Sequence, residues 1–184
     1  NELATDLATI KLSQLTEAPR VCFILCNTYS KPEYVLGVGP INDSVTVAAN
    51  RKRMGYTVYF LHNPKSNVFL EYLKFFIENT TQYLTVFYTG HGASIKDTDG
   101  DESDGCDEVL VFDEDYISDD VLVDIVKDNA NGETKIILLN DCCHSGTIWD
   151  LPTDEEERRH FPANIICLSA ADDDEQAKQG RNGF

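Results

Sequence analysis

The chain has 184 residues, of which 42% are hydrophobic and 10% aromatic, and its formal net charge is −17. This length and apolar content predict one folded domain and exclude an intrinsically disordered chain. The negative charge argues against nucleic acid as a partner, because phosphate binding requires a basic surface. No apolar run is long enough for a membrane helix, and the first twenty residues lack the pattern of a secretory signal.

The six cysteines indicate a reducing compartment. They are too few for a disulfide scaffold, and no pair has the spacing of a zinc site. Cys22, Cys26 and Cys167 lie in apolar runs, where a buried, reduced thiol is the usual state. We therefore expect a cytoplasmic location, with the nucleus as the alternative.

Short apolar runs alternate with helical patterns along the chain. Strands are predicted at 20–27, 56–63, 83–88, 135–141 and 164–169. Helices are predicted at 44–54, 67–78 and 119–129, with caps at Asn42 or Asp43, at Ser66 and at Ser118. This alternation predicts an α/β fold, with a mostly parallel central sheet and helices on both faces.

Three further segments interrupt this pattern. Residues 108–115 are expected to form an extra strand or hairpin at the edge of the sheet. Segments 93–107 and 152–164 are polar and are expected to be loops.

Two of the predicted strands run directly into residues with catalytic side chains. The strand at 83–88 leads into TGHG at 89–92, and the strand at 135–140 leads into DCCHSG at 141–146. Carboxyl ends of neighbouring parallel strands meet at one edge of a sheet. We therefore expect the two motifs to face each other.

His91 and one of two adjacent cysteines form the candidate catalytic pair. His144 directly follows Cys143, and neighbouring side chains of an extended segment point to opposite faces, so His144 is a poor base for Cys143. The same alternation sends one of Cys142 and Cys143 into the core without deciding which. The turn at 145–146 offers backbone N–H groups to an oxyanion, which favours Cys143 as the nucleophile and Cys142 as a packed thiol.

These motifs together resemble those of type I metacaspases, which are caspase-like cysteine peptidases. The resemblance is carried by YTGHG at 88–92, DCCHSG at 141–146 and WDLP at 149–152. Cys143 follows His91 by 52 residues, close to the spacing in caspases. The resemblance implies that Cys143 is the nucleophile and His91 the base, and we place the oxyanion region at Gly92.

The resemblance extends from about residue 20 to the end of the chain. It implies a caspase-like three-layer sandwich at 20–184, preceded by an N-terminal extension at 1–19. We expect the last strands of a full catalytic domain to be missing. Two segments depart from the family pattern, because GVGPI at 37–41 and SAADDDEQ at 169–176 stand where Ser-Gly-Cys motifs are usual.

Cleavage after Arg or Lys is also implied by the resemblance. Asp141 lies two residues before Cys143, and Asn42-Asp43 matches the family's Asn-Asp at the start of the first helix. Thr89 stands where the family usually has Ser. Two carboxylates can hold a guanidinium through charge-assisted hydrogen bonds. The alternative roles are a helix cap for Asp43 and loop ordering for Asp141.

The stretch from 97 to 124 contains thirteen Asp and Glu residues and no Lys or Arg. It does not match an EF-hand, because Glu102 occupies the position that requires glycine. The resemblance instead implies calcium activation through scattered acids, namely Asp107, Asp119, Asp120 and Asp150. The alternative for Asp119 and Asp120 is a favourable charge in the first turn of a helix.

We therefore expect a monomeric, Ca²⁺-activated cysteine endopeptidase that acts on protein or peptide substrates with a basic residue before the cut. Self-cleavage is expected after Arg158 or Arg159, in the polar segment 153–161. The alternative is a catalytically weak, calcium-binding relative that acts through protein binding. A nucleotide-binding domain is disfavoured, because no glycine-rich phosphate loop follows a strand.

Overall fold

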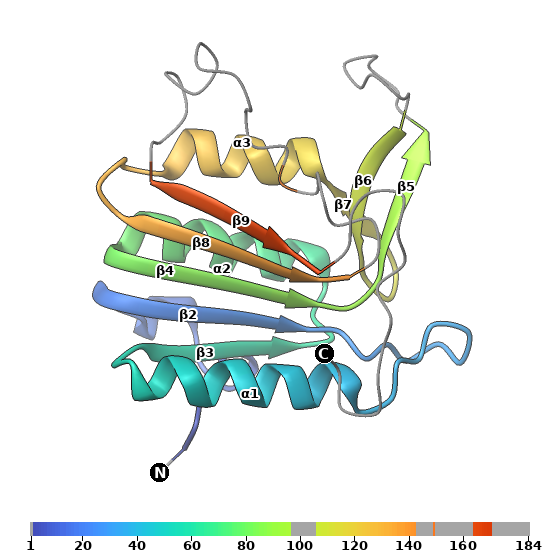
Figure 1. Cartoon of the computed structure of the whole chain (residues 1–184), viewed down its shortest axis with the longest axis horizontal. Helices are drawn as coiled ribbons and strands as arrows, with labels where there is room; N and C mark the ends of the chain where they lie inside the picture. The colour runs from blue at the N-terminus through green and yellow to red at the C-terminus, as the bar shows by residue number, and fades with distance from the viewer. Residues whose placement is uncertain (1, 97–105, 143–148, 150–163, 171–184) are drawn as a thin grey trace.

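The computed structural model describes residues 2–96, 106–142, 149 and 164–170. A six-stranded sheet forms its centre, in the order β1-β3-β2-β4-β8-β9, and every neighbouring pair is parallel (Figure 1). The strands are β1 (Thr5–Asp6), β2 (Ala18–Cys26), β3 (Thr57–His62), β4 (Thr80–Thr89), β8 (Lys135–Asp141) and β9 (Ile165–Ser169). All five predicted strands are therefore confirmed, with small shifts at their ends.

Residues before position 18 also contribute to this sheet and its core. β1 pairs with β3, and Leu7 is 1% exposed within the main apolar cluster. Two short 3-10 helices, Leu7–Thr9 and Leu12–Gln14, connect β1 to β2. The segment that we expected as an N-terminal extension thus supplies an edge strand of the central sheet.

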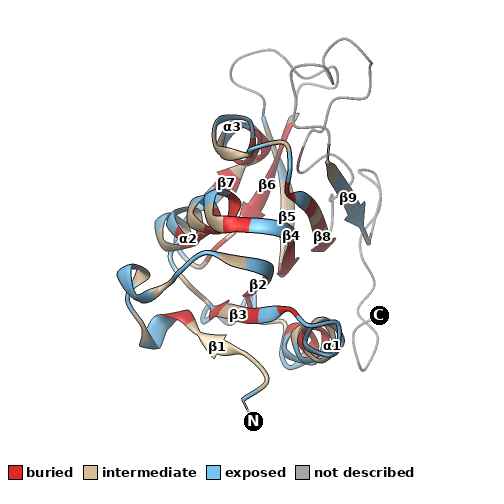
Figure 2. Ribbon diagram, turned by 90° about the vertical axis from the view of Figure 1, so that its left-hand side faces the viewer, coloured by how far each residue is buried: buried red, intermediate tan, exposed pale blue. Residues whose placement is uncertain are grey.

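Helices cover both faces of the sheet (Figure 2). α2 (Ser66–Asn79) and α3 (Asp119–Asn129) lie on one face, and α1 (Gly39–Arg53) lies on the other. Successive residues of β2 divide between these faces, since Phe23 and Leu25 join the cluster under α2 and α3, whereas Cys22 and Ile24 join the cluster under α1. The predicted α/β architecture is confirmed.

α1 begins five residues earlier than the predicted helix at 44–54. Pro40 lies in its first turn, where the missing N–H costs no intrahelical hydrogen bond. Asn42 and Asp43 lie inside the helix, so the prediction that one of them caps it was wrong. This difference matters for the site, because Asp43 is buried in the first turns of α1.

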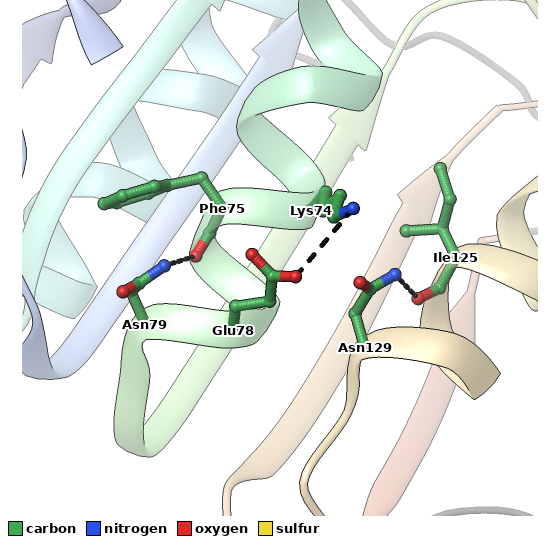
Figure 3. Close-up of polar contacts among 6 residues, drawn as sticks. All are labelled: Lys74, Phe75, Glu78, Asn79, Ile125 and Asn129. Atoms are coloured by element: carbon green, nitrogen blue, oxygen red, sulfur yellow. Dashed lines mark hydrogen bonds and ion pairs between the residues drawn. The ribbon is translucent and has the colours of Figure 1, made fainter. Parts of the chain in front are cut away.

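The other two helices start and end close to the predicted residues. Ser118 precedes α3 as predicted, whereas α2 begins at Ser66 itself. At the C-terminal ends, Asn79 Nδ2 donates to Phe75 O at 2.9 Å and Asn129 Nδ2 donates to Ile125 O at 2.7 Å (Figure 3). Each amide adds a side-chain hydrogen bond to a carbonyl group near the end of its own helix.

A second, antiparallel sheet adjoins the end of β4. It has the order β5-β6-β7 and contains Gly92–Lys96, Cys106–Val111 and Tyr116–Ser118. The loop prediction for 93–107 was therefore wrong at 93–96 and 106–107, while 97–105 lie outside the described residues. The predicted hairpin belongs to this separate sheet rather than to the edge of the central one. Of the helices that the structure describes, none is both long and apolar enough to cross a membrane.

Candidate active site

The ends of β4 and β8 bring the two sequence motifs together. Thr89 is the register partner of Asp141, and Gly90 N donates to Asp141 O at 3.3 Å. The predicted meeting of the motifs is confirmed as far as Cys142. The predicted nucleophile Cys143 and its neighbour His144 lie outside the described residues.

His91 follows the end of β4, and hydrogen bonds hold its backbone on both sides. Its N–H donates to the Tyr29 hydroxyl at 2.5 Å. Its carbonyl accepts from the Tyr88 hydroxyl at 2.6 Å and from Val111 N at 3.1 Å. Residue 91 is therefore held in place by three parts of the chain, namely the loop that follows β2, strand β4 and strand β6.

The imidazole ring of His91 is also held. Nε2 lies 2.7 Å from Tyr34 O, and the ring packs on that of Tyr29 with centroids 4.7 Å apart. A carbonyl oxygen can only accept a hydrogen bond, so in the neutral ring the hydrogen lies on Nε2. Nδ1 is then the nitrogen that can accept a proton, as a general base must.

Gly90 makes the packing behind His91 possible. A Cβ atom at this position would lie 2.7 Å from the hydroxyl oxygens of both Tyr29 and Tyr88. These hydroxyls are 3.3 Å apart and buried, and burial raises the pKa of Tyr29 to about 12. Both tyrosines therefore remain neutral hydrogen-bonding groups near neutral pH.

Cys142 points into the protein core. Its side chain is 2% exposed and belongs to the main apolar cluster, as does Trp149, whose indole N–H donates to Asn140 Oδ1 at 3.0 Å. This placement agrees with the prediction that Cys142 is a packed thiol.

Asp43, Asp141 and Thr89 form an acidic cluster beside the strand ends. Burial, with the nearby charge of Asp43, raises the pKa of Asp141 to about 6. The two carboxyl groups share a hydrogen bond, which requires a proton on one of them, and the Thr89 hydroxyl donates to Asp141. Asp43 and Thr89 are 8% and 1% exposed. The predicted first-subsite residues are therefore neighbours in space.

A cavity of about 510 Å³ lies between α1 and the strands β8 and β9. Asp43 is the charged residue on its wall, and Asn140 and Ser169 add polar groups. Apolar side chains, Phe87 and Leu139 among them, complete the lining. A cavity with apolar walls and one acidic residue in its lining suits a long side chain with a basic tip.

Three of the four predicted calcium ligands, Asp107, Asp119 and Asp120, lie on the second sheet and at the start of α3. Asp107 and Asp119 are buried, and Asp119 accepts hydrogen bonds from Glu108 N at 3.3 Å and from Asp120 N at 3.0 Å. Burial raises the pKa of Asp119 to about 7. Hard carboxylate oxygens with a poorly solvated charge are the donor chemistry that Ca²⁺ prefers.

Within the described part of the chain, however, no three His, Cys, Asp or Glu side chains are grouped closely enough to hold a metal. Asp150, the fourth predicted ligand, and Arg158 and Arg159, the predicted self-cleavage residues, lie outside that part. Gly92, where we placed the oxyanion region, is the first residue of β5 and pairs with Leu110.

The tyrosines that surround His91 were not predicted from the sequence. Tyr29 and Tyr34 lie in a connection that shows no periodic pattern, and the contact with Tyr34 uses only its backbone carbonyl. The one available signal was the pair of glycines around His91, which indicated a close approach by another group. It did not identify Tyr29 or Tyr88 as that group.

The fold and the site define a class of protein with the caspase-like fold. Caspase-1 from Spodoptera frugiperda superposes with a TM-score of 0.63 at 11% identity, covering 91% of this chain and 64% of the caspase. A protein from Geobacter sulfurreducens gives a TM-score of 0.67 at 18% identity, over 90% of this chain and 78% of the other. At these identities the likeness concerns the fold alone.

The family follows from the sequence comparisons. Residues 37–152 match the model of the metacaspase, peptidase C14 domain, and the chain belongs to this family of cysteine peptidases. Metacaspase III c of Phaeodactylum tricornutum is 46% identical over 70 residues, which are 35% of this chain and 21% of the relative. Metacaspase-1 of Candida glabrata is 43% identical over 70 residues, which are 35% of this chain and 18% of the relative. The chain thus spans about a fifth of the length of these relatives.

Proposed function

We propose that the protein is a cysteine endopeptidase in which Cys143 is the nucleophile and His91 the base. The observation that carries this proposal is the arrangement of His91, whose Nε2 lies 2.7 Å from Tyr34 O beside the strand that leads to Cys143. Nδ1 takes the thiol proton as the sulfur attacks the scissile carbonyl carbon. The imidazolium then protonates the leaving amine, and a water molecule that loses its proton to His91 hydrolyses the acyl-enzyme.

The acidic cluster supports a preference for Arg or Lys before the scissile bond. Asp43 and Asp141 would carry at least one negative charge at neutral pH, because a buried pair shares at most one proton readily. A guanidinium would replace that proton as the partner of both carboxylates. Thr89 keeps Asp141 oriented by donating its hydroxyl hydrogen.

Ca²⁺ is proposed as the activator, held by Asp107, Asp119, Asp120 and Asp150. When bound, it would neutralise the mutual repulsion of these carboxylates. The burial of Asp119 supports this role, because its ionised form is unfavourable there unless a cation lies close. Self-cleavage after Arg158 or Arg159 and a cytoplasmic location complete the proposal.

A turnover assay tests the function. The purified chain is given matched fluorogenic peptides with Arg, Lys or Asp before the reporter group, with millimolar Ca²⁺ or with chelator. We expect cleavage of the Arg and Lys peptides in Ca²⁺ and none by Cys143→Ala. Hydrolysis of the Asp peptide at a comparable kcat/KM would contradict the specificity. Absence of turnover with all peptides, together with saturable Ca²⁺ binding, would favour the non-catalytic relative.

A further inference from the structure

We propose that Tyr29 is a positioning residue, which fixes the place and orientation of His91 through its hydroxyl and its ring. The inference rests on the proposed function, in which His91 is the base. It concerns a residue from the connection after β2, far in sequence from both catalytic motifs.

Tyr29 contacts His91 in two independent ways. Its hydroxyl oxygen accepts the hydrogen bond from His91 N at 2.5 Å, and its ring lies against the imidazole at 4.7 Å between centroids, with planes inclined by 33°. The hydroxyl hydrogen is directed to Val111 O at 3.0 Å. This leaves an oxygen lone pair to accept from His91 N.

The backbone of Tyr29 adopts a conformation that side chains rarely tolerate. Its φ angle is 63°, in the left-handed region. The Asn63 side chain holds it there, because Asn63 Oδ1 accepts from Thr28 N at 2.7 Å and from Tyr29 N at 3.1 Å. Asn63 N in turn donates to Cys26 O at 3.1 Å. A strained residue that is clamped in this way, in contact with a proposed base, points to a functional constraint.

The same connection also supplies the carbonyl that fixes the tautomer. Tyr34 O faces His91 Nε2, and the Tyr29 and Tyr34 rings are 6.4 Å apart. Leu36 N donates to Thr28 O at 3.2 Å and closes the loop on itself. Tyr29 therefore sets where the backbone, the ring face and the proton-bearing nitrogen of His91 lie with respect to one another.

Removing the Tyr29 hydroxyl would leave His91 N–H without its acceptor. A part-buried donor without a partner is unfavourable, so residue 91 would shift toward another acceptor. Small displacements of a base lower the rate of proton transfer more than substrate binding. The expected change is therefore in kcat rather than in KM.

The test compares Tyr29→Phe with Tyr72→Phe. Tyr72 is a matched control, because it is 6% exposed, against 5% for Tyr29, and its hydroxyl donates to Leu7 O at 3.3 Å, away from the site. With an Arg peptide, we expect Tyr29→Phe to lower kcat about tenfold or more, within the range that general acid–base catalysis contributes, and to leave KM nearly unchanged. Tyr72→Phe should retain kcat.

A spectroscopic measurement separates this proposal from the proposed function. In the Cys143→Ala background, the ¹⁵N shifts of the His91 ring report its tautomer and protonation without turnover, and Tyr29→Phe should change them while Tyr72→Phe does not. Unchanged His91 shifts, or a kcat within twofold of wild type in a folded Tyr29→Phe variant, would overturn the positioning role. Full turnover by His91→Ala would instead overturn the proposed base, whatever Tyr29 does.

Discussion

Asp141 is the last residue of β8, and its side chain faces a second carboxylate. Its pKa of about 6 lies above the ordinary value of 3.8, first because it is buried and next because Asp43 is near. The folded chain therefore binds this proton more tightly than the unfolded chain does. The contribution of Asp141 to stability is greatest below about pH 4 and is lost as the pH rises through about 6.

We predict that Asp141→Asn removes this pH dependence. The free energy of unfolding, measured with denaturant between pH 4 and 7, should fall less steeply with pH in the variant than in wild type. Asp128→Asn, at an exposed position of α3, should behave as wild type. Parallel slopes in Asp141→Asn and wild type would show that the Asp43–Asp141 pair does not share a proton.

The two adjacent cysteines are predicted to differ sharply. Cys143→Ala should abolish peptidase activity, whereas Cys142→Ala should keep most of it and lower stability by about 1 kcal/mol, because a small buried group is lost. Turnover of an Arg peptide and thermal unfolding of both variants check this. Equal loss of activity in two folded variants would contradict the assignment of Cys143.

The turn from β4 into β5 is the element that positions His91. We predict that Gly90→Ala lowers kcat at least as much as Tyr29→Phe does, because its Cβ would collide with two buried hydroxyls at 2.7 Å. The double variant Gly90→Ala/Tyr29→Phe is the informative control, since Tyr29→Phe removes one of the two clashes. We expect the double variant to lose less stability than the sum of the losses in the two single variants. Losses in thermal unfolding that simply add would contradict the clash.

Strands β2, β3, β4, β8 and β9 of the central sheet were predictable because each is a short apolar run. The start of α1 was not, because the local signal of a capping side chain at Asn42 or Asp43 competed with Pro40, which is favoured in a first turn. β5 and β7 were missed for another reason. Their strand character comes from pairing with β6, a tertiary interaction that leaves little trace in 92–96 or 116–118.

The residues of the candidate site whose side chains take part in the chemistry were predictable from the sequence. His91, Asp43 and Asp141 stand in recognisable motifs, and the parallel register brings the strand ends together. The supports of His91 were not predictable, since they depend on a backbone carbonyl at Tyr34 and on the left-handed conformation of Tyr29. Neither the position of a backbone carbonyl nor a left-handed backbone conformation can be inferred from the type of the residue.

At the scale of the whole molecule, a net charge of −17 and a dense acidic stretch favour a response to cations. We predict that millimolar Ca²⁺ triggers cleavage after Arg158 or Arg159 in wild type and not in Cys143→Ala. Mass spectrometry of the chain in Ca²⁺ and in chelator identifies the cut. The double variant Asp119→Ala/Asp120→Ala should lose the response. Equal cutting of wild type in chelator, or a Ca²⁺ response that survives in the double variant, would contradict the proposed site.

The parallel pairing of β4 with β8 also has a consequence for synthesis on the ribosome. Parallel neighbours require a long crossover, and here β5, β6, β7 and α3 lie between the two strands. Chains emerge from the N-terminus, so His91 and its tyrosines are made well before β8 can join the sheet. The proposed dyad is therefore assembled only when β8 docks on β4, and a nascent chain that has not reached this step carries no complete peptidase site.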